Sequence, residues 1–366
     1  MKIGILKERQ ENEARVAISP DTIKKLRSQN IDILIESGAG LGAAFSDELF
    51  SEFGATVLDT GRSVYEQADV LFKIRPPCQS EDLDEISLLK KDSVLIGHMS
   101  ALSDLDLMAS IAKTGVIAFG LELLPRITRA QSMDVLSSQS NLAGYKAVLE
   151  ASVEMGRAFP MMMTAAGTIS AARVLVVGAG VAGLQAIATA KRMGGIVFAT
   201  DVRMSSKEQV ESLGGKFLTV EGAENLETSG GYAKETSDEF KKKQEDLLAE
   251  TLKKIDIVIC TALIPGKKAP VIIKESMIKN MQPGSVIYDL AAVQGGNTAV
   301  TKADEEIDLN GVKIMGEKNI LNKLPASASN LYSKNVFNFV SNLYDKEKKN
   351  VNINLEDEII KETLVK

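Results

Sequence analysis

Several residue types are scarce in this chain of 366 residues. Histidine occurs only at His98, which excludes a histidine-rich metal site and any mechanism that needs two histidines. The two cysteines, Cys78 and Cys260, are far apart and form no metal-binding cluster, so we expect no bound metal and a reducing, cytoplasmic compartment. Tryptophan is absent and aromatic residues make up 5%, too few for a surface on which nucleobases stack.

Long apolar runs and an excess of positive charge are also missing. No stretch reaches the roughly 18 apolar residues of a membrane span, and the start lacks the apolar region of a signal peptide. The formal net charge of −6 provides no basic field that would attract nucleic acid. Hydrophobic residues make up 45% and charged residues 25%, as in ordinary globular proteins. At roughly 100–200 residues per domain, the length predicts two or three domains.

Short apolar strands alternate with helices in two series along the chain. Repeated strand–helix units predict a parallel sheet with helices on both faces. We therefore expect an α/β protein of two domains, each with a mostly parallel sheet flanked by helices. The second series has the strand count of a Rossmann doubly wound fold, with strands expected at 173–177, 196–200, 216–218, 256–260, 285–289 and 312–315. The expected domains are 1–137 plus 325–366, and 138–324.

Two further segments have a distinct character. Residues 221–254 contain three glycines followed by dense charge, an unusual insertion between two strands of such a sheet. They form either a mobile functional loop at about 221–240 with a helix after it, or an exposed charged helix with a flexible start. The three methionines at 161–163 indicate a packed strand or loop.

A glycine-rich motif follows the first strand of the second series directly. Gly178, Gly180 and Gly183 form G-x-G-x-x-G between this strand and a helix, which predicts a dinucleotide-binding loop. The first glycine permits a tight turn, the second lets the backbone approach a pyrophosphate, and the third lets helix and strand pack closely. Asp201 ends the next strand and can accept hydrogen bonds from an adenosine ribose, which favours NAD over NADP. Arg203, close by, could instead receive a 2′-phosphate.

Polar side chains gather at 126–140, before a long helical pattern over 141–159. Their guanidinium, amide, carboxylate and hydroxyl groups can hold a carboxamide ring. The segment can equally be a solvated loop between domains with helix-capping residues. Arg15, Lys73 and His98 are similarly ambiguous, because a single histidine at the end of a strand is more often structural than catalytic.

Several motifs resemble one known family. G-I-L-K-E at 4–8 and N-E-A-R-V-A-I-S-P at 12–20 are similar to the N-terminal signature shared by alanine dehydrogenase and the proton-translocating NAD(P) transhydrogenase, with Leu6 in place of the usual proline. The glycine-rich stretch through Asp201 resembles the second signature of this family, with Gly195 in place of the usual alanine. Segments 125–144, 158–168 and 230–235 resemble the transhydrogenase side specifically. The resemblance runs from Met1 to about Phe339.

The transhydrogenase resemblance implies an NAD(H)-binding component of the Si-specific/Re-specific, proton-translocating enzyme. A hydride would pass directly between NAD(H) on this chain and NADP(H) on a partner subunit, coupled to proton translocation by membrane subunits. It implies a homodimer, an NADP-binding beta subunit, a membrane-spanning second part of the alpha subunit, and no nucleic acid. The protein would be cytoplasmic and peripheral on the inner membrane through these partners.

The resemblance also implies residue roles. Four residues would surround the nicotinamide and its ribose as the catalytic set: Arg126, Gln131, Asp134 and Ser137. Tyr232 would lie on a mobile loop that closes over the nucleotide. The complete set of implied cofactor contacts is Arg126, Arg129, Gln131, Ser132, Met133, Asp134, Val135, Leu136, Ser137, Gly178, Gly180, Val181, Ala182, Gly183, Asp201, Val202, Arg203, Gly231, Tyr232, Gln244 and Leu263.

Two alternative functions are compatible with parts of the sequence. Arg15, Lys73 and His98 stand where alanine dehydrogenase has substrate-binding and catalytic groups. However, a functional aspartate of that enzyme's D-I-A-I-D-Q-G-G stretch is replaced here by Val293, which can neither pair with a cation nor take a proton. A non-catalytic NAD-sensing module would keep the glycine motif but would have no use for the polar cluster at 126–140.

Overall fold

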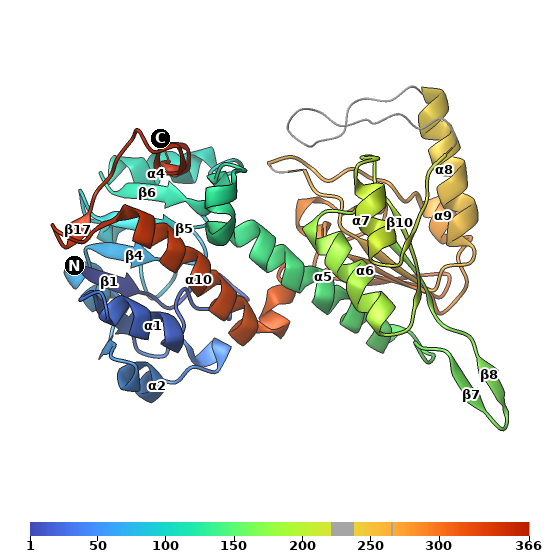
Figure 1. The fold of residues 1–366 in the computed structure, drawn as a ribbon, viewed down its shortest axis with the longest axis horizontal. Coiled ribbons are helices and arrows are strands. Elements are labelled where there is room, and N and C mark those ends of the chain that lie inside the picture. The colour runs from blue at the N-terminus through green and yellow to red at the C-terminus, as the bar shows by residue number, and fades with distance from the viewer. Residues whose placement is uncertain (221–237, 265, 366) are drawn as a thin grey trace. The chain divides into compact units, whose positions relative to one another are not determined.

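The computed structural model describes residues 1–220, 238–264 and 266–365, and the chain forms two compact units (Figure 1). The first unit comprises Met1–Gln139 and Leu321–Lys366, and the second comprises Ser140–Ile320. The expected boundaries at 137/138 and 324/325 lie within a few residues of these. The first break falls inside a helix, α5, so that one helix contributes residues to both units.

Six parallel strands form the sheet of the first unit, in the order β3-β2-β1-β4-β5-β6. The order reverses between β1 and β4, as in a doubly wound sheet. The strands are β1 (Lys2–Ile5), β2 (Asp32–Glu36), β3 (Thr56–Leu58), β4 (Val70–Phe72), β5 (Val94–Gly97) and β6 (Ile117–Gly120).

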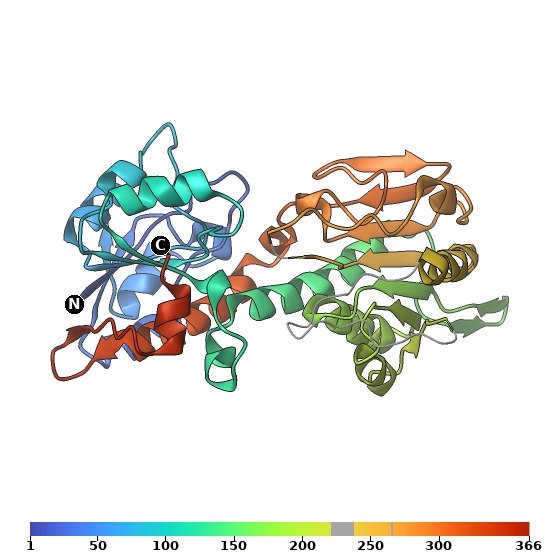
Figure 2. The same ribbon diagram turned by 90° about the horizontal axis from the view of Figure 1, so that it is seen from above.

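Helices cover both faces of this sheet (Figure 2). On one face α1 (Pro20–Arg27) and α10 (Pro325–Leu343) bury Ile23 and Phe339, and on the other α3 (Gly61–Gln67) and α4 (Leu105–Lys113) bury Val64 and Ile111. Local signals set where these helices begin, because Pro20 is the first residue of α1 and the Asp104 side chain caps α4 through the N–H of Leu107. The unit also contains α2 (Asp47–Glu52), α11 (Glu358–Thr363), the short strands β16 (Tyr344–Asp345) and β17 (Asn350–Val351), and the short helices η1 (Leu41–Ala43), η2 (Ile86–Leu88), η3 (Leu121–Leu123) and η4 (Thr128–Met133). The second boundary between the units falls inside a further short helix, η6 (Ile320–Lys323).

Seven strands form the sheet of the second unit, in the order β11-β10-β9-β12-β13-β15-β14. All neighbours are parallel except β14, which pairs antiparallel with β15 at the edge. The predicted α/β class and the doubly wound second sheet are confirmed, whereas the edge strand β14 was not expected. The strands are β9 (Arg173–Val177), β10 (Ile196–Thr200), β11 (Lys216–Phe217), β12 (Ile257–Cys260), β13 (Val286–Asp289), β14 (Glu306–Leu309) and β15 (Val312–Met315).

Helices alternate with the strands of the second unit, as the sequence predicts. On one face α8 (Asp238–Leu252) and α9 (Glu275–Ile278) bury Leu252 and Met277 against the sheet, and α6 (Val181–Arg192) packs on β9 and β10. The remaining helices are α5 (Val135–Glu154), α7 (Ser206–Ser212) and η5 (Ala292–Gln294). The mobile loop expected at about 221–240 lies almost entirely outside the described residues.

A two-stranded hairpin projects from the second unit (Figure 1). It consists of β7 (Met162–Thr164) and β8 (Gly167–Ile169). Met161 and Met163 are 61% and 78% exposed, so the prediction of a packed methionine segment was wrong. The physical reason is that the two strands pair only with each other, and no other element of the described chain pairs with either edge.

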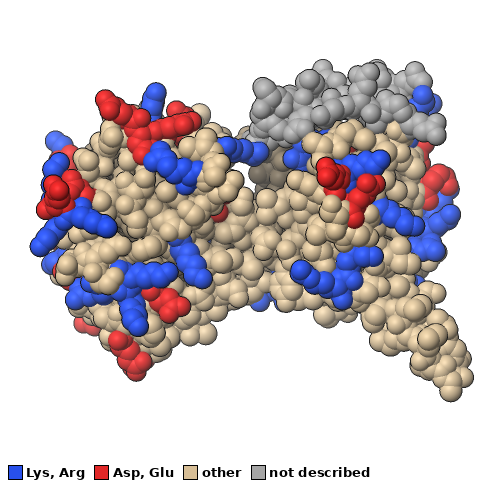
Figure 3. All heavy atoms as spheres, in the orientation of Figure 1, with Lys and Arg blue, Asp and Glu red and all other residues tan. Residues whose placement is uncertain are grey.

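Charged side chains of both signs intermix on the face of the two units seen in Figure 3. Within the described ranges, every helix is too short or too polar to traverse a bilayer.

Candidate functional site

The glycine-rich loop lies at the carboxyl end of β9, in the centre of the second sheet. The strand order reverses between β9 and β12, and the crevice outside such a reversal is where α/β sheets bind ligands. Val174–Val177 is an uninterrupted buried run, which holds the strand in the sheet interior up to the loop. Gly178 then adopts φ +93°, a conformation that favours glycine, and the chain turns into α6.

The three glycines of the motif are required for different reasons. A Cβ on Gly183 would lie 1.9 Å from the carbonyl oxygen of Gly178, so the start of α6 can approach the loop only without a side chain. A Cβ on Gly180 would meet no atom of the described residues within 4 Å. Gly180 is the N-cap of α6, whose first N–H groups are available to an anion. The open side of Gly180 therefore fits an approaching pyrophosphate.

Asp201 lies beside this loop, after β10. Its carboxylate accepts hydrogen bonds from the N–H of Ala179 at 2.7 Å and from the N–H of Arg203 at 2.8 Å. The Arg203 guanidinium binds the same carboxylate through Nε and one terminal nitrogen, each at 3.0 Å. Burial favours the protonated form, but Arg203 and the N–H donors outweigh it and hold the pKa of Asp201 below its ordinary value. Asp201 is therefore ionised at neutral pH, with its charge compensated by Arg203.

Asp134 lies immediately before α5 in the first unit. Its Oδ1 accepts the N–H of Ser137 at 2.9 Å and its Oδ2 accepts the Ser137 hydroxyl at 2.5 Å, which is the geometry of a helix N-cap. This cap explains why α5 begins at Val135 rather than at 141 as the sequence pattern predicted. The structure thus brings Asp134 and Ser137 together, and Asp134 has a structural role as the cap of α5.

The other residues of the 126–140 cluster divide by exposure. Arg126, Gln131, Ser132 and Leu136 are exposed, whereas Met133 and Val135 are buried in the hydrophobic core, so their side chains are unavailable to a ligand. Two side-chain amides of α10, those of Asn335 and Asn338, donate to the carbonyl oxygen of Ser132, each at 2.9 Å.

Arg129 is bound to the C-terminal segment of the chain. Its two terminal nitrogens each lie 2.7 Å from a carboxylate oxygen of Asp357. The Arg129 guanidinium lowers the pKa of Asp357 to about 2. A role for Arg129 in cofactor binding would require it to share or exchange this partner.

The remaining predicted contacts belong to the second unit. Val181, Val202 and Leu263 are exposed, and Ala182 and Gln244 are half-buried, the latter on α8. Gly231 and Tyr232 lie outside the described residues. Sequence reasoning missed Thr261 and Asn297, which follow β12 and β13 and contact the segments around the glycine-rich loop. Their position after two central parallel strands was the only available signal.

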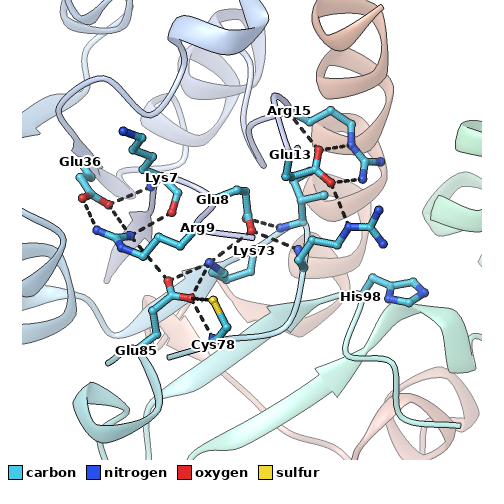
Figure 4. A network of polar contacts seen from close by, with 12 residues as sticks. Lys7, Glu8, Arg9, Glu13, Arg15, Glu36, Lys73, Cys78, Glu85 and His98 are labelled. Carbon is cyan, nitrogen blue, oxygen red and sulfur yellow. Dashed lines mark hydrogen bonds and ion pairs between the residues drawn. The ribbon is translucent and has the colours of Figure 1, made fainter. Parts of the chain in front are cut away.

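Lys73 and two glutamates form a buried cluster at the carboxyl ends of β1 and β4 (Figure 4). Lys73 Nζ lies 2.8 and 3.1 Å from the two carboxylate oxygens of Glu85 and 3.2 Å from Glu8 Oε2. All three side chains are at most 1% exposed. Because the ammonium group is fully enclosed between these carboxylates, Lys73 has a structural role in the unit.

Arg15 is also engaged by side chains of the chain itself (Figure 4). Its Nε and one terminal nitrogen bind the two oxygens of Glu13 at 2.7 and 2.6 Å, and the other terminal nitrogen binds Gln139 Oε1 at 2.9 Å. Arg75 binds the same Glu13 carboxylate at 2.9 Å. These internal partners favour a structural explanation for Arg15.

The His98 side chain is half-buried, and its Nδ1 atom is buried without a hydrogen-bond partner among the described residues. Its backbone N–H donates to the Tyr332 hydroxyl at 3.1 Å. Burial lowers the pKa of His98, Glu122 raises it, and Arg75 and Arg15 lower it further, so that the net shift is downward. The imidazole is therefore neutral at pH 7.

We expect His98 to titrate below its unfolded pKa of about 6.5. Because the folded pKa is depressed, the unfolded state takes up the proton more readily, and the contribution of His98 to stability is lost as pH falls from about 6.5 through the lower pKa of the folded state. Since this is the sole histidine, one set of imidazole resonances in a ¹H–¹³C spectrum reports the titration directly. A folded pKa at or above 6.5 would contradict this assignment.

No group of three His, Cys, Asp or Glu side chains in the described ranges could hold a metal ion.

Comparison with known proteins finds matches to one family along nearly the whole chain. Residues 4–143 match the model of the alanine dehydrogenase/PNT N-terminal domain, and residues 147–366 match that of the C-terminal domain. The chain is 51% identical to the first part of the NAD(P) transhydrogenase alpha subunit of Rhodospirillum rubrum, covering 100% of this chain and 96% of that protein.

A solved structure and a more distant relative complete the comparison. The crystal structure of transhydrogenase from Sinorhizobium meliloti superposes with a TM-score of 0.89 at 45% identity, covering 100% of this chain and 98% of that one. Alanine dehydrogenase of Methanococcus maripaludis is 29% identical, covering 81% of this chain and 74% of that protein.

Proposed function

Because the chain belongs to the alanine dehydrogenase/PNT family, we propose that it is the NAD(H)-binding component of a proton-translocating NAD(P) transhydrogenase. The observation that carries this proposal is the open glycine-rich loop, with ionised Asp201 beside it, at the strand reversal of the second sheet. Resemblance along the full length to transhydrogenase alpha subunits, and less to alanine dehydrogenases, supports the same function.

NAD(H), rather than NADP(H), is the nucleotide proposed for this chain. Asp201 is ionised and can accept hydrogen bonds from ribose hydroxyls, whereas a 2′-phosphate would meet its negative charge. The Arg203 guanidinium could itself bind a 2′-phosphate, but it is held by the Asp201 carboxylate, so discrimination against NADP(H) depends on Arg203 staying bound to Asp201. NADP(H) is then the nucleotide of the partner subunit.

The chain contributes binding and orientation to hydride transfer. When bound, the nicotinamide supplies the hydride chemistry itself. The glycine-rich loop and the start of α6 hold the pyrophosphate, and Asp201 orients the adenosine ribose. Arg126, Gln131, Asp134 and Ser137 are proposed to orient the nicotinamide ring and its ribose and to exclude water. No general acid or base is needed, which suits a chain whose single histidine is neutral and half-buried.

The proposed assembly includes a second copy of the chain, an NADP-binding beta subunit and the membrane-spanning second part of the alpha subunit. The exposed hairpin β7–β8 supports a homodimer, because residues 158–172 carry no charge (Figure 3) and natural edge strands are usually protected by charged residues. Proton translocation and the proposed position on the cytoplasmic face of the inner membrane would come from the partner subunits.

The proposed function is tested by a paired assay on the purified chain. One reaction contains the NADP-binding partner, NADPH and an oxidised NAD analogue, and the other contains NAD and L-alanine. Reduction of the analogue that depends on the partner, without activity toward alanine, is the expected result. NADH formation from alanine without a partner would overturn the proposal and make Arg15, Lys73 and His98 catalytic candidates.

Asp134→Asn is expected to slow hydride transfer by about 100-fold while the Kd for NADH changes less than about threefold. Asparagine caps a helix as well as aspartate does, so stability should be preserved and a loss of rate can be assigned to the carboxylate charge. The matched control is Asp104→Asn, which alters the cap of α4 in the same way. Unchanged turnover of the Asp134 variant with the partner present would remove its proposed role.

A further inference from the structure

Thr261 connects the end of β12 to the glycine-rich loop. Its hydroxyl donates toward the carbonyl oxygen of Gly178 at 2.9 Å and that of Val177 at 3.1 Å, and its N–H donates to Val177 at 2.8 Å. These carbonyls belong to the turn in which Gly178 takes its positive φ. Thr261 therefore fixes the loop from the strand on the other side of the reversal point.

Asn297 holds Ala262, the residue that follows Thr261 in the chain. Its Oδ1 accepts the N–H of Ala262 at 2.9 Å, and its Nδ2 donates to the carbonyl oxygens of Ala262 at 2.8 Å and Pro270 at 2.9 Å. The side-chain amide thus replaces the pairing that a neighbouring strand would provide. Asn297 is fully buried, so water cannot substitute for these bonds.

Asp289, at the end of β13, holds Asn297 in place. Its Oδ2 accepts the N–H of Asn297 and the hydroxyl of Thr301, each at 2.7 Å, while its Oδ1 accepts the N–H of Ala291 at 2.9 Å. The carbonyl oxygen of Asn297 accepts the N–H groups of Ile272 and Ile273 at 2.8 and 3.0 Å. The contacts form one series, from β13 through Asn297 and Ala262 to Thr261 and the glycine-rich loop.

We propose that Thr261 and Asn297 are positioning residues for NAD(H), a role that rests on the proposed function. They hold the segment after β12, with the exposed side chains of Leu263 and Ile264, at a set distance from the glycine-rich loop. A dinucleotide lies in the crevice between the loops that follow the two strands at the reversal point. The two residues thereby determine the width of the proposed site without touching the reacting atoms.

The test compares two substitutions of Thr261. Thr261→Val removes the hydroxyl at nearly constant shape and is expected to raise the Kd for NADH about five- to tenfold, the effect of one lost hydrogen bond. The rate of hydride transfer at saturating NADH should stay within about twofold. Thr261→Ser keeps the hydroxyl and should bind like the unaltered chain. Thr251→Val is the matched control, because it removes a hydroxyl that donates to the carbonyl oxygen of Leu247 within α8, away from the glycine-rich loop.

Binding is followed by the fluorescence of NADH, and folding by thermal unfolding. Equal NADH affinity of the Val and Ser variants would overturn the role of Thr261, and a rate loss at saturation would show that it acts on the chemical step instead. Asn297→Ala should weaken NADH binding in the same way, and unaltered affinity in a folded variant would overturn its role. If Asn297→Ala does not fold, the Thr261 pair decides. Failure of the unaltered chain to bind NADH would instead refute the proposed function.

Discussion

Replacing Lys73 with methionine is expected to lower the free energy of unfolding by about 3–5 kcal/mol, the usual cost of removing one partner from a buried ion pair. The substitution would leave Glu8 and Glu85 close together in the interior without the ammonium group that separates them. Burial raises the pKa of Glu8 already with Lys73 present, and loss of the cation would favour its protonation further. Chemical denaturation followed by circular dichroism measures the effect.

The control is Lys113→Met, at the exposed end of α4, which should change stability by less than about 0.5 kcal/mol. Neutralising the whole cluster provides a second check. Adding Glu8→Gln and Glu85→Gln to Lys73→Met removes the two buried carboxylate charges that Lys73 had paired, so part of the stability should return. The recovery is incomplete because Arg9, 3.7 Å from Glu85, loses one of its partners. A loss below about 1 kcal/mol in the single Lys73 variant would show that the cluster contributes little to the fold.

Gly180→Ala is expected to raise the Kd for NADH at least about 100-fold while the chain stays folded. The new Cβ meets no atom of the described chain within 4 Å, and φ at this residue is −78°, which alanine adopts readily. The methyl group would stand where the backbone must approach the pyrophosphate. Because alanine is a poorer N-cap than glycine, a stability loss of up to about 1 kcal/mol is expected. NADH titration and thermal unfolding separate these effects.

Gly156→Ala is the matched control, since that position is equally open and lies outside the motif. Gly183→Ala should behave differently from both, because its Cβ would lie 1.9 Å from a carbonyl oxygen and must disturb the loop itself. Wild-type affinity for NADH in Gly180→Ala would mean that the loop does not bind the pyrophosphate as proposed.

The candidate site shows which of its features local sequence patterns can predict and which they cannot. The G-x-G-x-x-G spacing correctly predicted a strand, a turn and a helix, because each glycine satisfies a steric need within a few residues. The compensation of Asp201 by Arg203 was not predicted, since a separation of two residues leaves many side-chain directions open. Asp134 was identified as a candidate, but its function as a helix cap became visible only with the observed start of α5.

The sequence by itself determined the fold class, because alternating apolar strands and helices can bury their surfaces only in layered α/β sheets. It also determined the family and the location of the dinucleotide motif. The tertiary structure alone decided that Lys73 is enclosed by Glu8 and Glu85, that Asn297 holds Ala262, and that the methionine hairpin is exposed. The contacts join residues that are far apart in the sequence; Lys73 and Glu8, for example, are 65 positions apart. Which of such residues meet is decided by how the strands and loops pack. Local periodicity and propensity carry no information about that packing, so only the assembled units show which polar residues are structural and which remain free to bind a ligand.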